Sequence, residues 1–170
     1  MKFYWISGSW RVTNEEVKKD IENTVKNIIE KWDWIVTWWA LWVDYIATQL
    51  VLSLWDPKTQ LKIYLPITLD KFCAHYNKRA TEWVITQEQA DIITSQLKEA
   101  FDIAPGSIYD KTPYTEANVE SYYARNTTII EKCDELCAFQ VNESQWTQDA
   151  IDKAIELGKP VIVKKYSIDS

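Results

Sequence analysis

Two segments combine small, hydroxyl-bearing residues in a way that is typical of phosphate-binding loops. The first is Ser7-Gly8-Ser9-Trp10-Arg11, and the second is Asn142-Glu143-Ser144-Gln145-Trp146-Thr147. Each follows a short apolar run and precedes a helical pattern, and the free N–H groups at a helix N-terminus suit a phosphate. Arg11 adds a full charge and a two-pronged hydrogen-bond donor. The alternative interpretation is that the hydroxyls are plain N-caps and that Arg11 is a surface charge.

A third segment, Trp38-Trp39-Ala40-Leu41-Trp42-Val43-Asp44, also lies between a predicted strand and a predicted helix. Two adjacent indoles at such a turn would keep a phosphate away from the backbone. Nothing in Trp favours the positive φ that these turns often need, whereas Gly adopts it readily. The segment therefore has the position of a ligand loop but not its expected residues.

The elements that must position these loops alternate between short apolar strands and amphipathic helices. This order predicts an α/β fold, a single Rossmann-like three-layer domain over residues 1–170 with a mainly parallel sheet of about five strands. A helical insert over about 66–117 follows the third strand. Thr13 with Glu16, and Thr86 with Gln89, predict capping boxes. The expected strands are 3–6, 35–37, 61–65, 136–141 and 161–163, and the expected helices extend to about 31 and over 43–53, 69–82, 87–101, 118–132 and 145–157.

Composition narrows the classes of partner and compartment. The formal net charge of −6 disfavours a nucleic-acid-coating protein, because such proteins are usually basic. The three cysteines, Cys73, Cys133 and Cys137, have no disulfide-framework spacing, and with a single His they predict buried thiols in a reducing compartment and no metal site. The apolar region 34–55 is interrupted by Asp44 and Gln49 and is too short in its apolar part to span a membrane. We expect a cytoplasmic protein, without a signal peptide or membrane partner, and compatible with a homo-oligomer.

Four motifs, in order, resemble those of the DNA-processing protein A (DprA/Smf) family. They are Ile6-Ser7-Gly8-Ser9-Trp10-Arg11, the segment 35–44, Tyr123-Ala124-Arg125-Asn126-Thr127-Thr128-Ile129-Ile130, and the stretch 144–163. The chain is thus similar to the wider SLOG superfamily, which joins DprA-like and Lonely Guy-like proteins. The resemblance implies a nucleotide-type phosphate ligand and no separate cofactor.

The resemblance also implies which residues surround that ligand. Asp44 would accept from a sugar hydroxyl or brace its own loop, and Arg125 and Asn126 would reach the ligand from a neighbouring segment. In the insert, His75, Lys78 and Arg79 fall within one helical turn beside Tyr76, and this group would either cover the ligand or form a solvated helix face. The full set of expected binding residues is Gly8, Ser9, Arg11, Trp38, Trp39, Ala40, Trp42, Asp44, Arg125, Asn126, Ser144, Trp146 and Thr147.

Three functions remain open at this stage. The first is a stand-alone DprA-like module that binds a nucleotide or nucleotide-derived phosphate. The second is an enzyme that cleaves the N-glycosidic bond of nucleoside monophosphates. Lonely Guy proteins have a Glu where this chain has Ala150, so Asp149 or Glu143 would have to act in its place. The third is single-stranded DNA binding, which the acidity of the chain disfavours.

The counts of three Gly and ten Trp are unusual, since Gly is commonly about 7% of a chain. The resemblance has Gly where this chain has Trp38, Trp42 and Trp146. Trp32 and Trp83 each follow a predicted helix, at a position that Gly often takes. We hypothesise that eight tryptophans are glycine positions, because the codon UGA encodes Gly in some bacterial lineages and Trp in another translation table. The eight are Trp32, Trp34, Trp38, Trp39, Trp42, Trp55, Trp83 and Trp146.

Overall fold

The computed structural model describes residues 1–169, and residue 170, the last of the predicted domain, lies outside the described residues. A six-stranded, entirely parallel sheet has the order β4-β3-β2-β1-β5-β6. In its central register, Trp5 lies between Val36 of β2 and Leu136 of β5. The strands are β1 (Phe3–Gly8), β2 (Trp34–Thr37), β3 (Leu61–Tyr64), β4 (Ile108–Tyr109), β5 (Glu135–Val141) and β6 (Val161–Tyr166).

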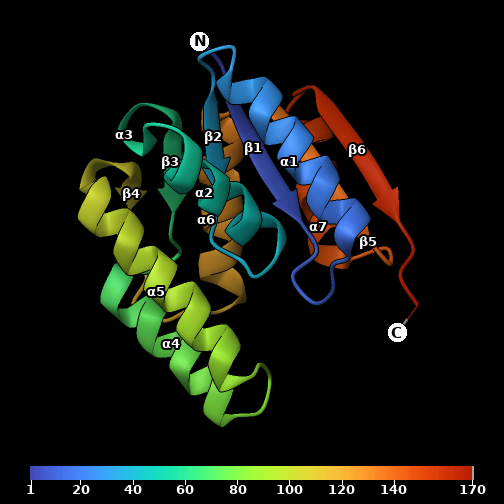
Figure 1. The fold of residues 1–170 in the computed structure, drawn as a ribbon. Helices are drawn as coiled ribbons and strands as arrows, with labels where there is room; N and C mark the ends of the chain where they lie inside the picture. The colour runs from blue at the N-terminus through green and yellow to red at the C-terminus, as the bar shows by residue number, and fades with distance from the viewer. Residues whose placement is uncertain (170) are drawn as a thin grey trace.

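The helices lie on both faces of this sheet, and a pair of them, α4 and α5, extends from one end (Figure 1). The fold is therefore the predicted α/β Rossmann-like arrangement, with six strands rather than about five. Strand β4 was not predicted, because it is only two residues long and lies in a segment whose Pro and Gly residues indicate a loop. The helices are α1 (Glu15–Ile29), α2 (Val43–Leu54), α3 (Pro57–Gln60), α4 (Leu69–Thr81), α5 (Gln87–Ile103), η1 (Pro105–Ser107), α6 (Val119–Lys132) and α7 (Gln145–Glu156).

Two separate apolar cores explain the three layers. Neighbouring residues of a strand point to opposite faces, so Ile6 of β1 joins one core and Trp5 joins the other. The first core contains Val17 and Ile21 of α1, and it also receives side chains from α2, α4 and α5. The second contains Ile129 of α6 with residues of α7. No helix within residues 1–169 is long and apolar enough to cross a membrane.

Of the two capping boxes predicted at helix N-termini, one is confirmed and the other is wrong by one residue. The capping box of Thr86 and Gln89 at the start of α5 is confirmed. The capping box predicted at Thr13 is wrong by one residue, because the side chain of Asn14 accepts the hydrogen bond from Val17 N at 2.9 Å. Asn and Thr are both effective N-caps, so residue type alone could not separate the two positions.

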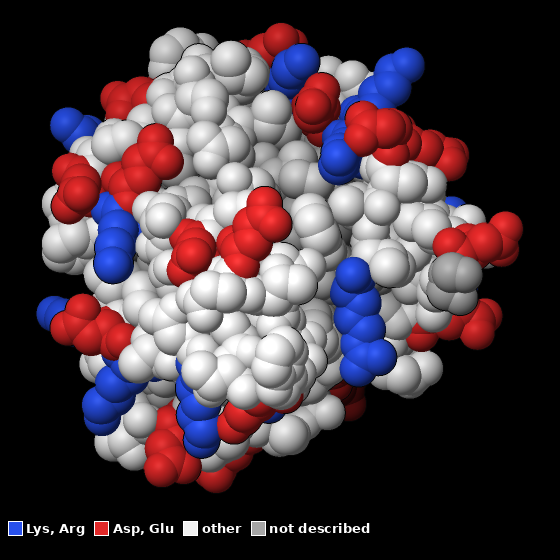
Figure 2. Space-filling model, turned by 60° about the horizontal axis from the view of Figure 1, so that its bottom comes forward, with Lys and Arg blue, Asp and Glu red and all other residues white. Residues whose placement is uncertain are grey.

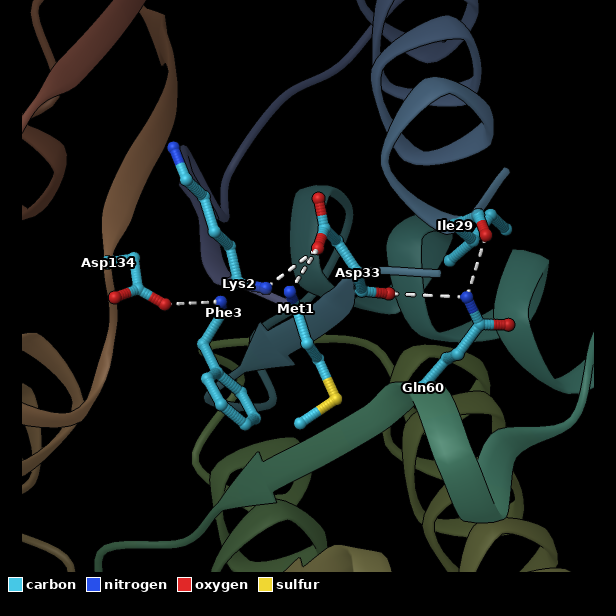
Figure 3. A network of polar contacts seen from close by, with 7 residues as sticks. All are labelled: Met1, Lys2, Phe3, Ile29, Asp33, Gln60 and Asp134. Carbon is cyan, nitrogen blue, oxygen red and sulfur yellow. Dashed lines mark hydrogen bonds and ion pairs between the residues drawn. The ribbon is translucent and has the colours of Figure 1, made fainter. Parts of the chain in front are cut away.

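Side chains tie the strands together at the amino ends of the sheet (Figure 3). Asp33 Oδ1 accepts from Lys2 N at 2.7 Å, and Asp134 Oδ2 accepts from Phe3 N at 2.7 Å. Gln60 Nε2 donates to the carbonyl of Asp33 at 3.2 Å, and this links β3 to the turn before β2. The amino end is thus closed by hydrogen bonds, which leaves the carboxyl ends of the strands for ligands.

Four of the eight tryptophans at expected glycine positions have left-handed backbone. Their φ angles are 60° at Trp32, 67° at Trp39, 67° at Trp42 and 60° at Trp83. A side chain with a Cβ is strained in this region. Trp55 has an ordinary extended φ of −137°. The remaining three, Trp34, Trp38 and Trp146, do not have a positive φ either.

The three cysteines are free thiols. Cys133 and Cys137 are buried, as predicted, and burial raises the pKa of each to about 12. Cys73 is half-buried on α4. Among residues 1–169, no three His, Cys, Asp or Glu side chains gather in a way that would hold a metal ion.

Candidate functional site

A pocket of about 390 Å³ lies at the carboxyl ends of the central strands. The order of the sheet reverses direction between β1 and β5, which is where open parallel sheets bind ligands. We call this cavity the switch pocket. All three predicted loop regions contribute to it, and so does the helical insert. From the predicted set it includes Arg11, Trp38, Ala40 and Trp146, and beside them Trp10, Leu41, His75, Tyr76, Arg79, Val84, Ile85, Ala117, Asn118, Val119 and Tyr122.

Gly8 and Ser9 hold β1 against its neighbours. A Cβ at Gly8 would collide with the side chain of Val43 and would lie 2.7 Å from the carbonyl oxygen of Phe139. Ser9 Oγ accepts from Val141 N at 2.8 Å and donates to Val141 O at 3.1 Å. The hydroxyl therefore joins β1 to β5, and neither residue lines the switch pocket.

Arg11 is exposed at the rim of the switch pocket. Its guanidinium carbon lies 5.0 Å from the ring centre of Trp10, within range of a cation–π contact. It forms no ion pair with an acidic side chain in the part of the chain that the structure describes. The Trp42 indole N–H donates to the Arg11 carbonyl at 3.3 Å, so the two loops contact each other. An anion at the rim would meet a cation without competition.

Asp44 contacts its own loop between β2 and α2, which is the second of the two roles considered for it, the first being contact with a sugar hydroxyl. Its Oδ1 accepts from Trp38 N at 3.0 Å, whereas Oδ2 is buried and lacks a partner. The side chain is 0% exposed, and burial raises the pKa of the carboxyl to about 8. A protonated carboxyl is therefore the main form at neutral pH, and it is no counter-ion for a neighbouring cation.

Trp39 and Trp42 form the strained part of this loop. The Trp39 indole is buried and its N–H has no hydrogen-bond partner, while its carbonyl accepts from the Tyr76 hydroxyl at 3.1 Å. Trp42 has a positive φ at the N-cap of α2 and makes no side-chain cap there. Neither side chain lines the switch pocket.

Arg125 lies behind the wall of the switch pocket. Its guanidinium carbon is 3.8 Å from the ring centre of Trp38 and 5.2 Å from that of Tyr122, and both rings line the pocket. The side chain of Arg125 is 4% exposed, and burial lowers its pKa to about 9. Nε and Nη2 both donate to Asn126 Oδ1, at 3.3 and 2.9 Å. Arg125 and Asn126 are thus close to the predicted site without reaching into its cavity.

The segment 142–147, which includes the first turn of α7, contributes Trp146 to the pocket but not its polar residues. Ser144 is the N-cap of α7 without a side-chain hydrogen bond, and the buried Thr147 hydroxyl has no partner. Glu143 is exposed in the turn, and Asp149 Oδ2 accepts from Lys153 Nζ at 2.8 Å. Within residues 1–169, no Asp or Glu side chain lines the switch pocket.

The insert supplies pocket residues that the sequence alone left undecided. His75, Tyr76 and Arg79 of α4 line the switch pocket, whereas Lys78 does not and contacts Glu82 Oε1 at 3.7 Å. His75 Nε2 lies 3.2 Å from the Tyr122 hydroxyl. Burial lowers the pKa of His75, which favours the neutral ring. Tyr122 of α6 also lines the pocket, although it occupies an apolar position of its helix. Its hydroxyl is the sequence signal that could have placed it beside a polar cavity.

Comparison with known proteins identifies the fold. No protein-family model and no curated protein matches the chain. The solved structure of DNA processing protein A from Helicobacter pylori is similar to this one, with a TM-score of 0.64 and 20% sequence identity. That structure concerns the single-stranded DNA binding mode of the Helicobacter pylori protein. The match covers 95% of this chain and 64% of that one. DprA from Streptococcus pneumoniae is 14% identical with a TM-score of 0.49, covering 95% of this chain and 58% of that chain.

A third structure, NosK from Streptomyces actuosus, is 10% identical with a TM-score of 0.29 over 99% of this chain and 89% of that chain. The Helicobacter pylori match supports a Rossmann-like DprA fold, in agreement with the resemblance of the motifs. This chain spans less than two thirds of the length of either DprA chain.

Proposed function

We propose that the switch pocket binds a nucleotide or a nucleotide-derived phosphate ligand. The supporting observation is that two arginines, Arg11 and Arg79, line one cavity together with aromatic rings from five different segments. Guanidinium groups match phosphate oxygens, and aromatic faces stack on bases. The cavity volume lies in the range of about 300–1,000 Å³ that is common for small-molecule sites. With its DprA-like motifs, the chain is proposed as a member of the SLOG superfamily.

The two arginines differ in whether an acidic side chain already pairs with them. Arg79 Nη1 already contacts Glu82 Oε2 at 3.1 Å, in a pair whose side chains are both about two-fifths exposed. Exposed pairs of this kind stabilise little, so a phosphate can compete for Arg79. Arg11 has no such competitor in the described chain. We therefore assign the larger share of phosphate binding to Arg11.

Calorimetric titration with AMP and with ribose 5-phosphate tests this function. Arg11→Ala should weaken AMP binding at least tenfold, because a hydrogen bond to a charged group contributes about 1.5–3 kcal/mol. Arg79→Ala should weaken it less. Lys31→Ala, an exposed residue after α1, is the matched control and should leave binding unchanged. AMP binding that is insensitive to both arginine variants would contradict the proposal.

Single-stranded DNA is the second candidate ligand, and the fold likeness to the Helicobacter pylori protein favours it. A phosphodiester and a base could use the same cations and rings as a mononucleotide. On the face in Figure 2, acidic and basic side chains are interspersed and neutral residues cover much of the surface. Such a surface supports few phosphate contacts. Displacement of a fluorescent oligothymidylate by AMP would indicate one shared site, and AMP binding without oligonucleotide binding would remove this candidate.

We also infer that the eight tryptophans occupy codons that specify glycine in the source organism. The positive φ angles of Trp32, Trp39, Trp42 and Trp83 support this inference, because glycine is the residue that adopts them without strain. The gene sequence tests it directly. UGA is expected at all eight positions and UGG at Trp10, whereas UGG at Trp38 and Trp42 would overturn the inference.

A further inference from the structure

A second cavity, of about 620 Å³, lies between the β3–β4 edge of the sheet and α6. We call it the α6 pocket. Its lining includes Tyr64, Tyr109, Tyr114, Lys111, Arg125 and Lys132. The Tyr64 and Tyr109 rings are stacked with their centres 4.7 Å apart. Neither the predicted loops nor the proposed nucleotide site uses this cavity.

We propose that the α6 pocket binds an oxyanion, such as the phosphate group of a small organic phosphate, and that Arg125 is its buried cation. The proposal is independent of the nucleotide site in the switch pocket. Arg125 Nη1 is buried and has no hydrogen-bond partner, and the other donors of the side chain go to the neutral amide of Asn126. A buried guanidinium with an unpaired N–H is costly, and an anion would supply the missing acceptor.

The charges around the cavity favour an anion. Lys111 and Lys132 line the α6 pocket with Arg125, and neither lysine forms an ion pair among residues 1–169. The one acidic residue in the lining is Asp110, whose Oδ2 accepts from Leu69 N at 3.1 Å. Asp44, the other acid near Arg125, is buried, which raises its pKa to about 8 and so disfavours its charged form. Among residues 1–169, Arg125 forms no ion pair with an acidic side chain.

Two aromatic rings keep the α6 pocket apart from the switch pocket. Trp38 and Tyr122 line the switch pocket, and both rings lie against the guanidinium of Arg125, which lines the α6 pocket. Lys111 and Lys132 line the α6 pocket, and neither lines the switch pocket. A ligand in the switch pocket would meet Arg11 instead. The two sites can be separated by mutation.

The test is calorimetric titration of the full chain with inorganic phosphate and, in a separate arm, with AMP. Arg125→Gln should weaken phosphate binding at least tenfold, and so should the paired change Lys111→Glu with Lys132→Glu. Because Arg11 is assigned to the switch pocket, these comparisons are made in an Arg11→Ala background, and Lys31→Ala is the control that should leave phosphate binding within twofold. Circular dichroism checks that Arg125→Gln folds. If it does not fold, the two exposed lysines decide the question, because their reversal leaves the core intact.

The outcomes are distinct. Phosphate binding that is lost in the lysine variant and kept in Arg11→Ala supports the α6 pocket. Tighter binding of AMP than of phosphate in the Arg11→Ala protein would identify a phosphate ester rather than the free ion as the occupant. Phosphate binding that is lost in Arg11→Ala and kept in the lysine variant, or no binding of either probe, would overturn the proposal. The change in AMP affinity on Arg11→Ala tests the switch pocket, whereas the loss of phosphate binding in the lysine variant tests the α6 pocket alone.

Discussion

The Asp44 carboxyl is held between the β2–α2 loop and the inner wall of the switch pocket, where no water reaches it. Its folded pKa of about 8 is well above the value of about 4 that an unfolded chain has. Folding therefore takes up a proton between these two pH values. The contribution to stability is complete below about pH 4, falls as the pH rises towards 8, and is constant above that.

Asp44→Asn is expected to remove this dependence. The amide oxygen can still accept from Trp38 N, and the side chain can no longer ionise. The variant should gain stability relative to the starting protein as the pH rises from 4 to 8, by at most about 1.4 kcal/mol per pH unit. Urea unfolding at a series of pH values measures the difference. A difference that stays constant over this range would show that the carboxyl is not held in its neutral form.

Trp32 offers a test of backbone strain that does not involve packing. The residue follows α1 with φ of 60°, and its side chain is 76% exposed. Trp32→Gly should be more stable than Trp32→Ala by about 1 kcal/mol, because alanine keeps the Cβ that the left-handed region penalises. Thermal and urea unfolding of the pair give the value.

The same pair at Trp55, where φ is −137°, is the control and should show the opposite order. Equal stability of the Trp32 pair would remove the backbone support for a glycine at that position.

At the scale of elements, α4 is held over the switch pocket by two polar contacts. The Tyr76 hydroxyl donates to the Trp39 carbonyl at 3.1 Å, and His75 contacts the Tyr122 hydroxyl at 3.2 Å. These contacts join the insert to the β2–α2 loop and to α6. These contacts add to the packing of Phe72 of α4 in the first core, and together they position the outer wall of the pocket.

Tyr76→Phe should destabilise the protein by about 1–3 kcal/mol, because it leaves a buried carbonyl unpaired. It should also increase amide exchange in α4 more than in α6. Hydrogen exchange followed by mass spectrometry measures both. Tyr123→Phe, at a position that is 40% exposed, is the matched control and should change little. Unchanged exchange in α4 would mean that other contacts fix the helix.

The sequence predicted the elements that have a long apolar pattern, and it did not predict features that depend on how side chains pack. The periodicity of α1, α5 and α7 and the apolar runs of β1 and β5 predicted these elements to within a few residues. The two-residue strand β4 has no pattern of its own. Arg125 was expected to reach the ligand, but the direction of a side chain from α6 depends on how Trp38 and Tyr122 pack. The place of Arg11 at the carboxyl end of β1 could be predicted, because its motif follows that strand directly.

At the scale of the whole molecule, the charge balance limits how nucleic acid can bind. The chain carries a formal net charge of −6, and two arginines line the switch pocket. Any oligonucleotide bound there should release few counter-ions. A slope of about −0.7 per phosphate contact for single strands gives about −1.4 for two contacts in a plot of log Kobs against log salt concentration.

Fluorescence anisotropy of a labelled oligothymidylate at four salt concentrations measures this slope. Arg11→Ala should reduce its magnitude by about half, whereas Lys31→Ala should not change it. A slope steeper than about −3 would require a much larger basic surface than the switch pocket provides, and would place the nucleic acid elsewhere on the molecule.

The position of β1 at the centre of the sheet has a consequence for how the chain folds. Its pairing with β5 joins residues 131 apart in sequence. The two hydrogen bonds between Ser9, directly after β1, and Val141 join residues 132 apart. Pairing across so long a loop is slow, and a chain leaving the ribosome cannot complete it until β5 has been made. Until then β1 has an open edge. The nascent chain is therefore expected to depend on chaperones late in synthesis, and truncation before residue 141 should yield aggregates rather than a smaller folded unit.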